Sequence, residues 1–254
     1  MLENHAASLM AGQLRRQART YWELSRSHRF SLLFALPLLA LYEWLEFIAP
    51  VRTGGGVIRN GADVMLTTAF SWMLGPRGPL VFMALVIGVS LWLIRRDRGS
   101  GPLQPRIFAA MLGESVLLAL LFGIVVGAAT MQLVGPLRSL ATGVAGGSSL
   151  ARLTLSLGAG LYEELLFRVV IVALIANGFR LLGVGRLASG IIATTVGALL
   201  FSAFHYIGPF GEPVKLESFV FRFLAGMAFS ALYLTRGFGI TAWTHALYDV
   251  AVLL

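Results

Sequence analysis

Long apolar runs alternate with short polar breaks along most of this chain. Seven of the runs are long enough to cross about 30 Å of hydrocarbon as helices. They cover residues 30–49, 78–94, 107–127, 153–176, 187–206, 217–234 and 238–254. Breaks rich in glycine and proline separate them, as in PVRTGGG at 50–56 and IGPFGEP at 207–213. The pattern predicts an all-α protein, a polytopic bundle of about seven or eight transmembrane helices.

A further apolar segment, ADVMLTTAFSWML at 62–74, is shorter than the others and carries Asp63. We interpret it as interfacial or re-entrant, because a run of this length is too short to span a bilayer as a helix. The arginine cluster at 95–106 supports this interpretation. With residue 1 in the cytoplasm and seven spans, the cluster falls on the inner side, as the positive-inside rule requires. A true span at 62–74 would move it outside.

The composition agrees with a membrane protein. The chain has 254 residues, of which 57% are hydrophobic and 13% are charged, and its mean hydropathy is +0.80. The net charge of +8 is spread over the loops and forms no basic block interleaved with aromatic residues, so nucleic acid is not expected as a partner. The chain has no cysteine, which excludes disulfides and thiolate chemistry. We expect a multi-pass protein of the bacterial inner (cytoplasmic) membrane, surrounded by the lipid bilayer.

Four regions follow from these patterns. Residues 1–29 form a basic N-terminal tail, which could be solvated or could lie partly on the membrane surface as a helix. Residues 30–141 hold the N-terminal transmembrane helices. A linker rich in glycine and serine at 142–149 follows them. The region 150–254 holds the spans on which the unusual ionisable residues are concentrated.

The stretch EELLFR at 163–168 places three charges inside an apolar run. On insertion scales each charge near the bilayer centre costs roughly 2.5–3.5 kcal/mol, so these side chains need partners or a task. Glu164 and Arg168 are four residues apart, so in an α-helix they can form an ion pair. Glu163 then points about 100° away and is free to face another helix.

Other ionisable residues lie on later spans. His205 is near the end of its run, and Phe201 shares its helix face. His245 and Asp249 are also four residues apart on one face. Glu163 and these three ionisable side chains could therefore converge on one pocket between helices.

Two alternatives remain open from the residues alone. The polar side chains could form a hydrogen-bond network that joins helices, or they could line the ion or proton path of a transporter. Three further acids lie in or near spans: Glu43, Glu46 and Glu114. For these we favour an interfacial or helix-pairing role.

Three motifs resemble the CPBP family of intramembrane proteases, which includes the type II CAAX prenyl endopeptidases and bacterial relatives linked to bacteriocin self-immunity. The family pattern is EExxxR, then FxxxH, then HxxxN or HxxxD. Here the motifs read EELLFR at 163–168, FSAFH at 201–205 and HALYD at 245–249, in that order. The resemblance covers roughly residues 153–254. Asp249 stands where many members of the family have asparagine.

The resemblance implies an intramembrane endopeptidase that hydrolyses a peptide bond in a membrane-anchored protein or peptide. The catalytic residues that it implies are Glu163, Glu164, Arg168, His205, His245 and Asp249. Glu163 with His205 would activate a water molecule, while His245 with Asp249 would hold the oxyanion. Arg168 would keep its glutamate partner ionised. Phe201 is expected at the substrate pocket.

The family was long described as metalloproteases, and Glu163, His205 and His245 could together ligate zinc. The HExxH spacing of a zinc-binding helix is absent, however. We therefore favour a glutamate-dependent enzyme with no cofactor over a zinc enzyme. The alternatives to a protease are a non-catalytic membrane scaffold or immunity protein and an ion- or proton-coupled transporter.

Overall fold

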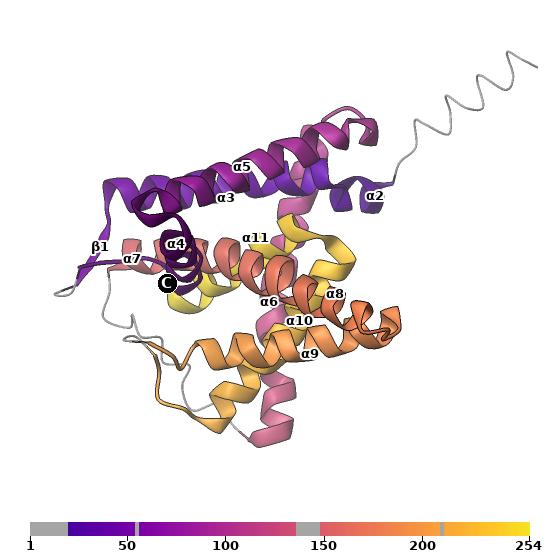
Figure 1. Ribbon diagram of the computed structural model, residues 1–254. Coiled ribbons are helices and arrows are strands. Elements are labelled where there is room, and N and C mark those ends of the chain that lie inside the picture. The colour runs from indigo at the N-terminus through magenta and orange to yellow at the C-terminus, as the bar shows by residue number, and fades with distance from the viewer. Residues whose placement is uncertain (1–19, 54–55, 136–147, 209–210) are drawn as a thin grey trace, which may run out of the picture.

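The computed structural model describes residues 20–53, 56–135, 148–208 and 211–254, and these are mostly helical (Figure 1). Its α-helices are α2 (Tyr21–Arg26), α3 (His28–Ile48), α4 (Gly61–Leu74), α5 (Gly78–Arg96), α6 (Pro105–Val134), α7 (Ser149–Gly158), α8 (Ala173–Leu181), α9 (Arg186–Phe204), α10 (Leu216–Arg236) and α11 (Phe238–Leu253). The predicted all-α class is thereby confirmed. Most of the predicted N-terminal tail (residues 1–19) and most of the predicted linker (residues 142–147) lie outside the described residues.

Shorter elements connect these helices. The 3₁₀ turns η1 (Gly75–Arg77) and η2 (Arg98–Ser100) flank α5, and two π-helical segments, η3 (Ala159–Glu163) and η4 (Leu165–Val172), join α7 to α8. Strands β1 (Val51–Thr53) and β2 (Gly56–Ile58) form an antiparallel hairpin that pairs the first residue of β1 with the last of β2. The hairpin occupies the break that the sequence predicts between the first two apolar segments.

Within the described residues, five helical stretches are long and apolar enough to cross a membrane. They are α3, residues 61–96, α6, α9 and α10. These stretches account for five of the seven predicted spans. The predicted span at 153–176 lies instead on the segmented helix from α7 to α8, and that at 238–254 lies on the 16-residue α11. Residues 61–96 count as one stretch because only η1 separates α4 from α5. The interfacial placement expected for residues 62–74 therefore stays a prediction.

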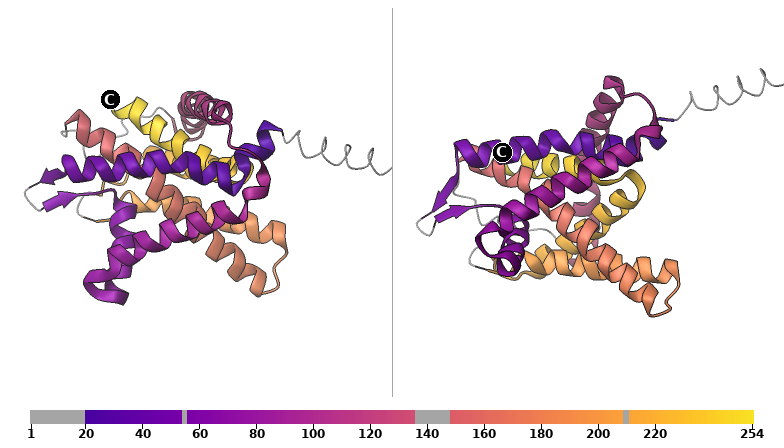
Figure 2. Two further views of the ribbon diagram at one scale, coloured as in Figure 1. Left: turned by 90° about the horizontal axis from the view of Figure 1, so that it is seen from above. Right: turned by 45° about the horizontal axis from the view of Figure 1, so that its top comes forward.

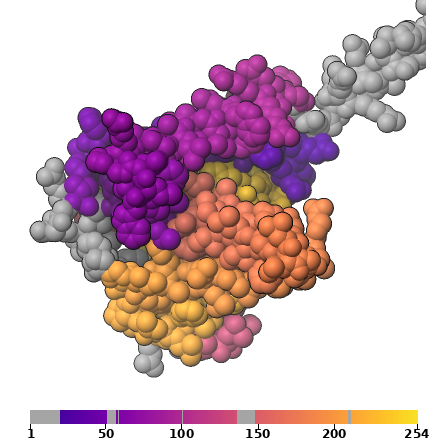
Figure 3. Space-filling view, in the orientation of Figure 1, coloured from indigo at the N-terminus to yellow at the C-terminus, as the bar shows by residue number. Residues whose placement is uncertain are grey.

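The helices form two sides of a bundle with a helical layer between them. Helices α3 and α5 pack together on one side, and α9 packs against α10 on the other (Figures 1 and 2). The segment from α7 to α8 runs between them, and α11 packs against α3, α6, α7 and η3. Figure 3 shows the same division on the surface, where α4 and α5 cover much of the upper part of the view, and residues after 149, with part of α6, cover the lower part.

Polar residues fix where several helices begin and turn. Thr20 caps α2 and forms a capping box with Glu23, while Ser27 caps α3 by accepting a hydrogen bond from the backbone N–H of Phe30. Between α10 and α11 there is a single residue, Gly237, with φ of 81°. That left-handed conformation favours glycine and lets α11 fold back directly from the end of α10.

Glu114 pairs helices, as the sequence predicts. Its carboxylate accepts the Nε–H of Arg236 at 2.5 Å and the hydroxyl of Tyr21, so it joins α6 to α10 and α2. The Arg236 guanidinium also lies 3.7 Å from the centroid of the Trp22 ring. Burial, together with the hydrogen bond to Glu114, raises the pKa of Tyr21 above its usual range. The contacts hold the start of the described chain against the end of α10.

Glu43 also pairs helices, because it accepts hydrogen bonds from Arg59 at 3.0 Å and from Tyr162 at 2.6 Å. Glu46 is buried in α3, and its Oε1 has no hydrogen-bond partner among the described residues. A helix-pairing role for Glu46 therefore stays a prediction.

Candidate active site

The EELLFR stretch lies on π-helical turns, where the sequence predicts an α-helix. Segment η3 ends at Glu163 and η4 begins at Leu165. Backbone hydrogen bonds in a π-helix run from residue i to i+5, and such turns are frequent at functional sites. The prediction of a regular α-helix through 153–176 is therefore wrong, although the chain stays helical from Ser149 to Leu181.

Glu164 and Arg168 form the predicted ion pair. Arg168 Nη1 lies 3.1 Å from Glu164 Oε1, and the two side chains are 1% and 0% exposed. The guanidinium also lies 4.6 Å from the ring centroid of Phe201 and 5.4 Å from that of Phe229. Arg168 is thus enclosed by its carboxylate partner and two aromatic faces, which replace the water that a free guanidinium would bind.

Glu164 Oε1 also contacts His245, and the sequence did not predict this contact. His245 Nδ1 lies 2.7 Å from Glu164 Oε1, and the imidazole stacks on Phe229 with ring centroids 4.3 Å apart. The other ring nitrogen, Nε2, lies 3.8 Å from Asp249 Oδ2. This distance is too long for a hydrogen bond but within ion-pair range. Glu164 therefore fixes the ring of His245 so that Nε2 faces Asp249.

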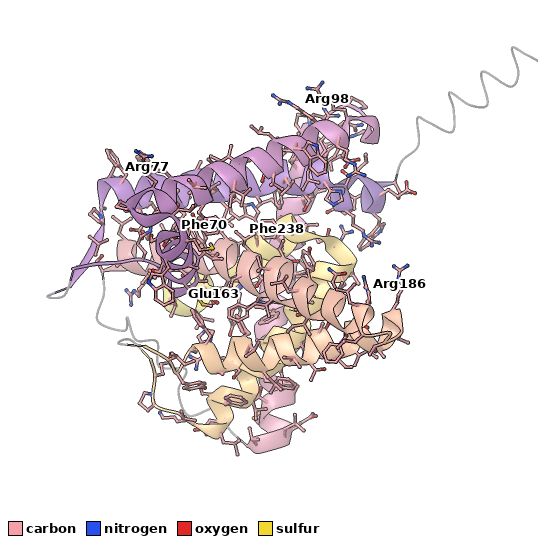
Figure 4. The ribbon with its side chains drawn as sticks, viewed as in Figure 1. Phe70, Arg77, Arg98, Glu163, Arg186 and Phe238 are labelled. Carbon is pink, nitrogen blue, oxygen red and sulfur yellow. The ribbon has the colours of Figure 1, made fainter. Side chains whose placement is uncertain are left out.

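Glu163 lies inside the bundle, close to α4 (Figure 4). Its Oε1 accepts a hydrogen bond of 3.0 Å from Asn60 Nδ2, at the start of α4. Its charge interacts with the imidazoles of His205 and His245. Glu163 therefore faces other helices, as the sequence predicts, and is close enough to both histidines for their charges to interact.

His205 follows α9 directly as its C-cap residue, so it lies at the helix end, where the sequence places it. Its Nδ1 lies 2.9 Å from the carbonyl oxygen of Phe201. Because a carbonyl oxygen only accepts, Nδ1 carries the proton, and in the neutral ring Nε2 keeps a lone pair. The ring of Phe201 is 3% exposed and packs edge-on against His205 and Phe167. The place of Phe201 in a substrate pocket stays a prediction.

The chain that follows His205 is held by Arg222, a residue that the sequence analysis did not consider. Arg222 donates to Glu212 at 2.7 Å and to the hydroxyl of Tyr206 at 3.1 Å, and the backbone N–H of Glu212 donates to the carbonyl of His205 at 3.0 Å. Arg222 also interacts electrostatically with His205. Its position inside the apolar run 217–234 is the signal that could have identified it.

Asn60 is the second residue that the sequence analysis missed. It lies in the N-terminal half, 103 positions before the glutamate that it contacts. The pair Asn60–Gly61 directly before an apolar run is a signal for a helix N-cap. That signal predicts the start of α4 but gives no indication of the contact with Glu163.

A zinc site requires three or more ligating side chains around one point. Among the described residues, no three His, Asp or Glu side chains are placed so that they could hold a metal ion. The set considered from the sequence, Glu163, His205 and His245, is described in full and does not meet this requirement. The arrangement of the described side chains therefore forms no zinc site, and the preference for a glutamate-dependent enzyme over a zinc enzyme stays a prediction.

Residues 145–251 match the family model described as type II CAAX prenyl endopeptidase Rce1-like. The resemblance to the CPBP protease family is confirmed for this region. The match includes all three motifs and ends two residues after Asp249, while α2–α6, and Asn60 with them, lie outside it. Comparisons with curated proteins and with solved structures gave no significant match. The Rce1-like match, together with the apolar helices, supports an integral membrane endopeptidase of the CAAX type that acts on membrane-anchored proteins.

Proposed function

We propose that this protein cleaves a peptide bond of a membrane-anchored protein or peptide, with a water molecule activated by Glu163 and His205. The observation that carries the proposal is the arrangement of the buried Glu163 with His205 and His245, which come from separate apolar helices and both pack edge-on against Phe201. Ionisable groups gathered in this way within a membrane bundle are typical of a functional site. The Rce1-like match over the same residues supports proteolysis as that function.

The tautomer of His205 suits water activation. Since Nδ1 donates to the Phe201 carbonyl, Nε2 can accept a hydrogen bond from the water. Glu163 then takes the proton as the water oxygen attacks the carbonyl carbon of the substrate, and the π electrons of that carbonyl move to its oxygen. The protonated Glu163 later gives this proton to the leaving amine, so the carboxylate is regenerated.

His245 and Asp249 are suited to stabilise the oxyanion that forms on the carbonyl oxygen of the substrate. Glu164 accepts a hydrogen bond from His245 Nδ1, so Nε2 is the ring atom left for the substrate. It must carry a proton to donate to an oxyanion, and Asp249 Oδ2 lies 3.8 Å away, so that a protonated Asp249 can serve as a second donor. Arg168 balances the charge of Glu164 and thereby keeps this ring in place. These two residues are positioning residues, since they act through His245.

Cleavage by the purified protein tests the proposal. The wild type and Glu163→Gln are reconstituted in lipid with a membrane-anchored peptide, and the products are identified by mass spectrometry. Glutamine keeps the shape of the side chain but cannot take a proton, so we expect wild-type expression and thermal stability with no cleavage. Cleavage by Glu163→Gln at the wild-type rate would end the glutamate-base mechanism. A purified wild type that cleaves no membrane-anchored peptide would instead favour a scaffold or transport role.

A further inference from the structure

Asn60 contacts the central glutamate of the site from a part of the chain that the family match does not reach. We propose that Asn60 is a positioning residue that orients the Glu163 carboxylate for water activation. This inference rests on the function proposed above. It assigns the N-terminal half a direct part in the reaction, in addition to anchoring the protein in the membrane.

The orientation of the Asn60 amide is fixed by the two different partners of its oxygen and nitrogen. Oδ1 accepts the backbone N–H of Ala62 at 2.9 Å and so caps α4, while Nδ2 donates to Glu163 Oε1 at 3.0 Å. An exchange of the two amide atoms would place a donor against the Ala62 N–H and an acceptor against the carboxylate, so both bonds would be lost. Asn60 is 6% exposed, so water cannot readily replace either partner.

A hydrogen-bond network holds Asn60 in place. Its backbone N–H donates to the hydroxyl of Tyr42 at 3.3 Å, and this hydroxyl donates to Asp63 Oδ2 at 2.9 Å. Arg59 bonds to the same Asp63 oxygen at 2.5 Å and reaches Glu43 at 3.0 Å. These hydrogen bonds connect Asn60 and its neighbour Arg59 to side chains of α3 and α4, and so fix the position of Asn60.

The network also holds the backbone next to Glu163. Tyr162, the residue before it, donates its hydroxyl to Glu43 at 2.6 Å. Gly158 makes this approach of the two halves sterically feasible. A Cβ at Gly158 would lie 2.6 Å from the Tyr42 ring and 2.8 Å from Asn60 Cβ, closer than side chains pack. Glu163 is thus held through its carboxylate by Asn60 and through its chain neighbour by Glu43.

This geometry assigns different roles to the two carboxylate oxygens of Glu163. Asn60 occupies Oε1, which leaves Oε2 as the oxygen that can accept the proton of the water. Loss of the donor should lower kcat with little change in KM, because the substrate does not contact the amide.

Two substitutions separate this role from helix capping. Serine and aspartate both cap helices well, so Asn60→Ser and Asn60→Asp should preserve α4. Serine is too short to reach Glu163, and aspartate turns a donor into an acceptor against the carboxylate. For both variants we expect a kcat lower by at least roughly 10- to 100-fold, the range for a lost hydrogen bond to a charged group. Asn60→Ser should keep wild-type thermal stability, whereas Asn60→Asp should be less stable because it places a second carboxylate against Glu163. Asn177→Ser and Asn177→Asp, at an exposed position of α8, are the matched controls and should not change kcat.

A second readout does not depend on activity. The infrared difference between the wild type and Glu163→Gln contains the bands of the Glu163 carboxylate, whose frequencies depend on the hydrogen bonds that its oxygens accept. In Asn60→Ser these bands should shift, whereas in Asn177→Ser they should not. Unchanged bands and an unchanged kcat in both Asn60 variants would overturn the inference. If the proposed proteolysis fails, the bands still decide whether Asn60 bonds to the carboxylate, so the two failures are distinguishable.

Discussion

Because both partners of the Glu164–Arg168 ion pair are buried, the loss of stability on removing one of them can be estimated. Arg168→Ala removes the guanidinium 3.1 Å from Glu164 Oε1 and leaves this 0% exposed carboxylate with His245 as its remaining partner. Breaking a buried ion pair on one side costs about 3–5 kcal/mol. The contacts of the guanidinium with Phe201 and Phe229 add about 0.5–2 kcal/mol. We therefore expect a loss of at least about 3 kcal/mol, which is large relative to the stability of most domains.

The assay is unfolding of the purified protein in mixed micelles by titration with a denaturing detergent, followed by tryptophan fluorescence. Arg180→Ala is the matched control, since Arg180 lies on α8 and is exposed, and its loss should change stability by no more than about 0.5 kcal/mol. The double substitution Glu164→Gln with Arg168→Met removes both charges and should restore much of the stability. If Arg168→Ala is as stable as Arg180→Ala, the pair is hydrated in the membrane and the argument from burial fails.

Three further predictions concern topology, packing and the oxyanion. A reporter fused within 95–106 should show a cytoplasmic location, and a location on the other side would mean that α4 spans the membrane. Gly160→Leu should abolish activity and destabilise the bundle, since a Cβ there would lie 2.6 Å from that of Ala246 on α11, whereas Gly178→Leu meets open space and should be tolerated. His245→Ala should lower kcat by a factor on the order of 10²–10³ while substrate still binds. Asp249→Asn should stay active, because its amide can donate to the oxyanion. A kcat that is lower in Asp249→Asn than in His245→Ala would contradict the roles assigned to these residues.

Features that depend on helical spacing could be predicted from the sequence. The apolar runs predicted α3, α6, α9 and α10 to within a few residues at most boundaries. The four-residue spacing predicted the pairing of Glu164 with Arg168, because residues four apart are neighbours whichever helix lies beside them. The energetic penalty for an unpaired acid in an apolar run likewise predicted the helix-pairing role of Glu114.

Features that depend on how the helices pack could not be predicted in this way. An apolar run does not distinguish α-helical from π-helical turns, so η3 and η4 were missed. The contact of Glu164 with His245 joins positions 81 apart, and that of Asn60 with Glu163 joins positions 103 apart. Both contacts require the packing of η3 against α11 and α4. The sequence shows which side chains are costly in a membrane, but their partners on other helices are determined by the fold.

The claim that the Glu163–His205 pair activates water without a metal ion is tested most directly by single-turnover cleavage with protein treated with a strong chelator. Metal content is measured on the same sample, and a membrane-anchored peptide is bound before the reaction is followed. We expect cleavage at the untreated rate by wild-type protein that holds far less than one equivalent of metal. A rate that is lost on chelation and returns in proportion to zinc bound, up to one equivalent per chain, would contradict the metal-independent mechanism.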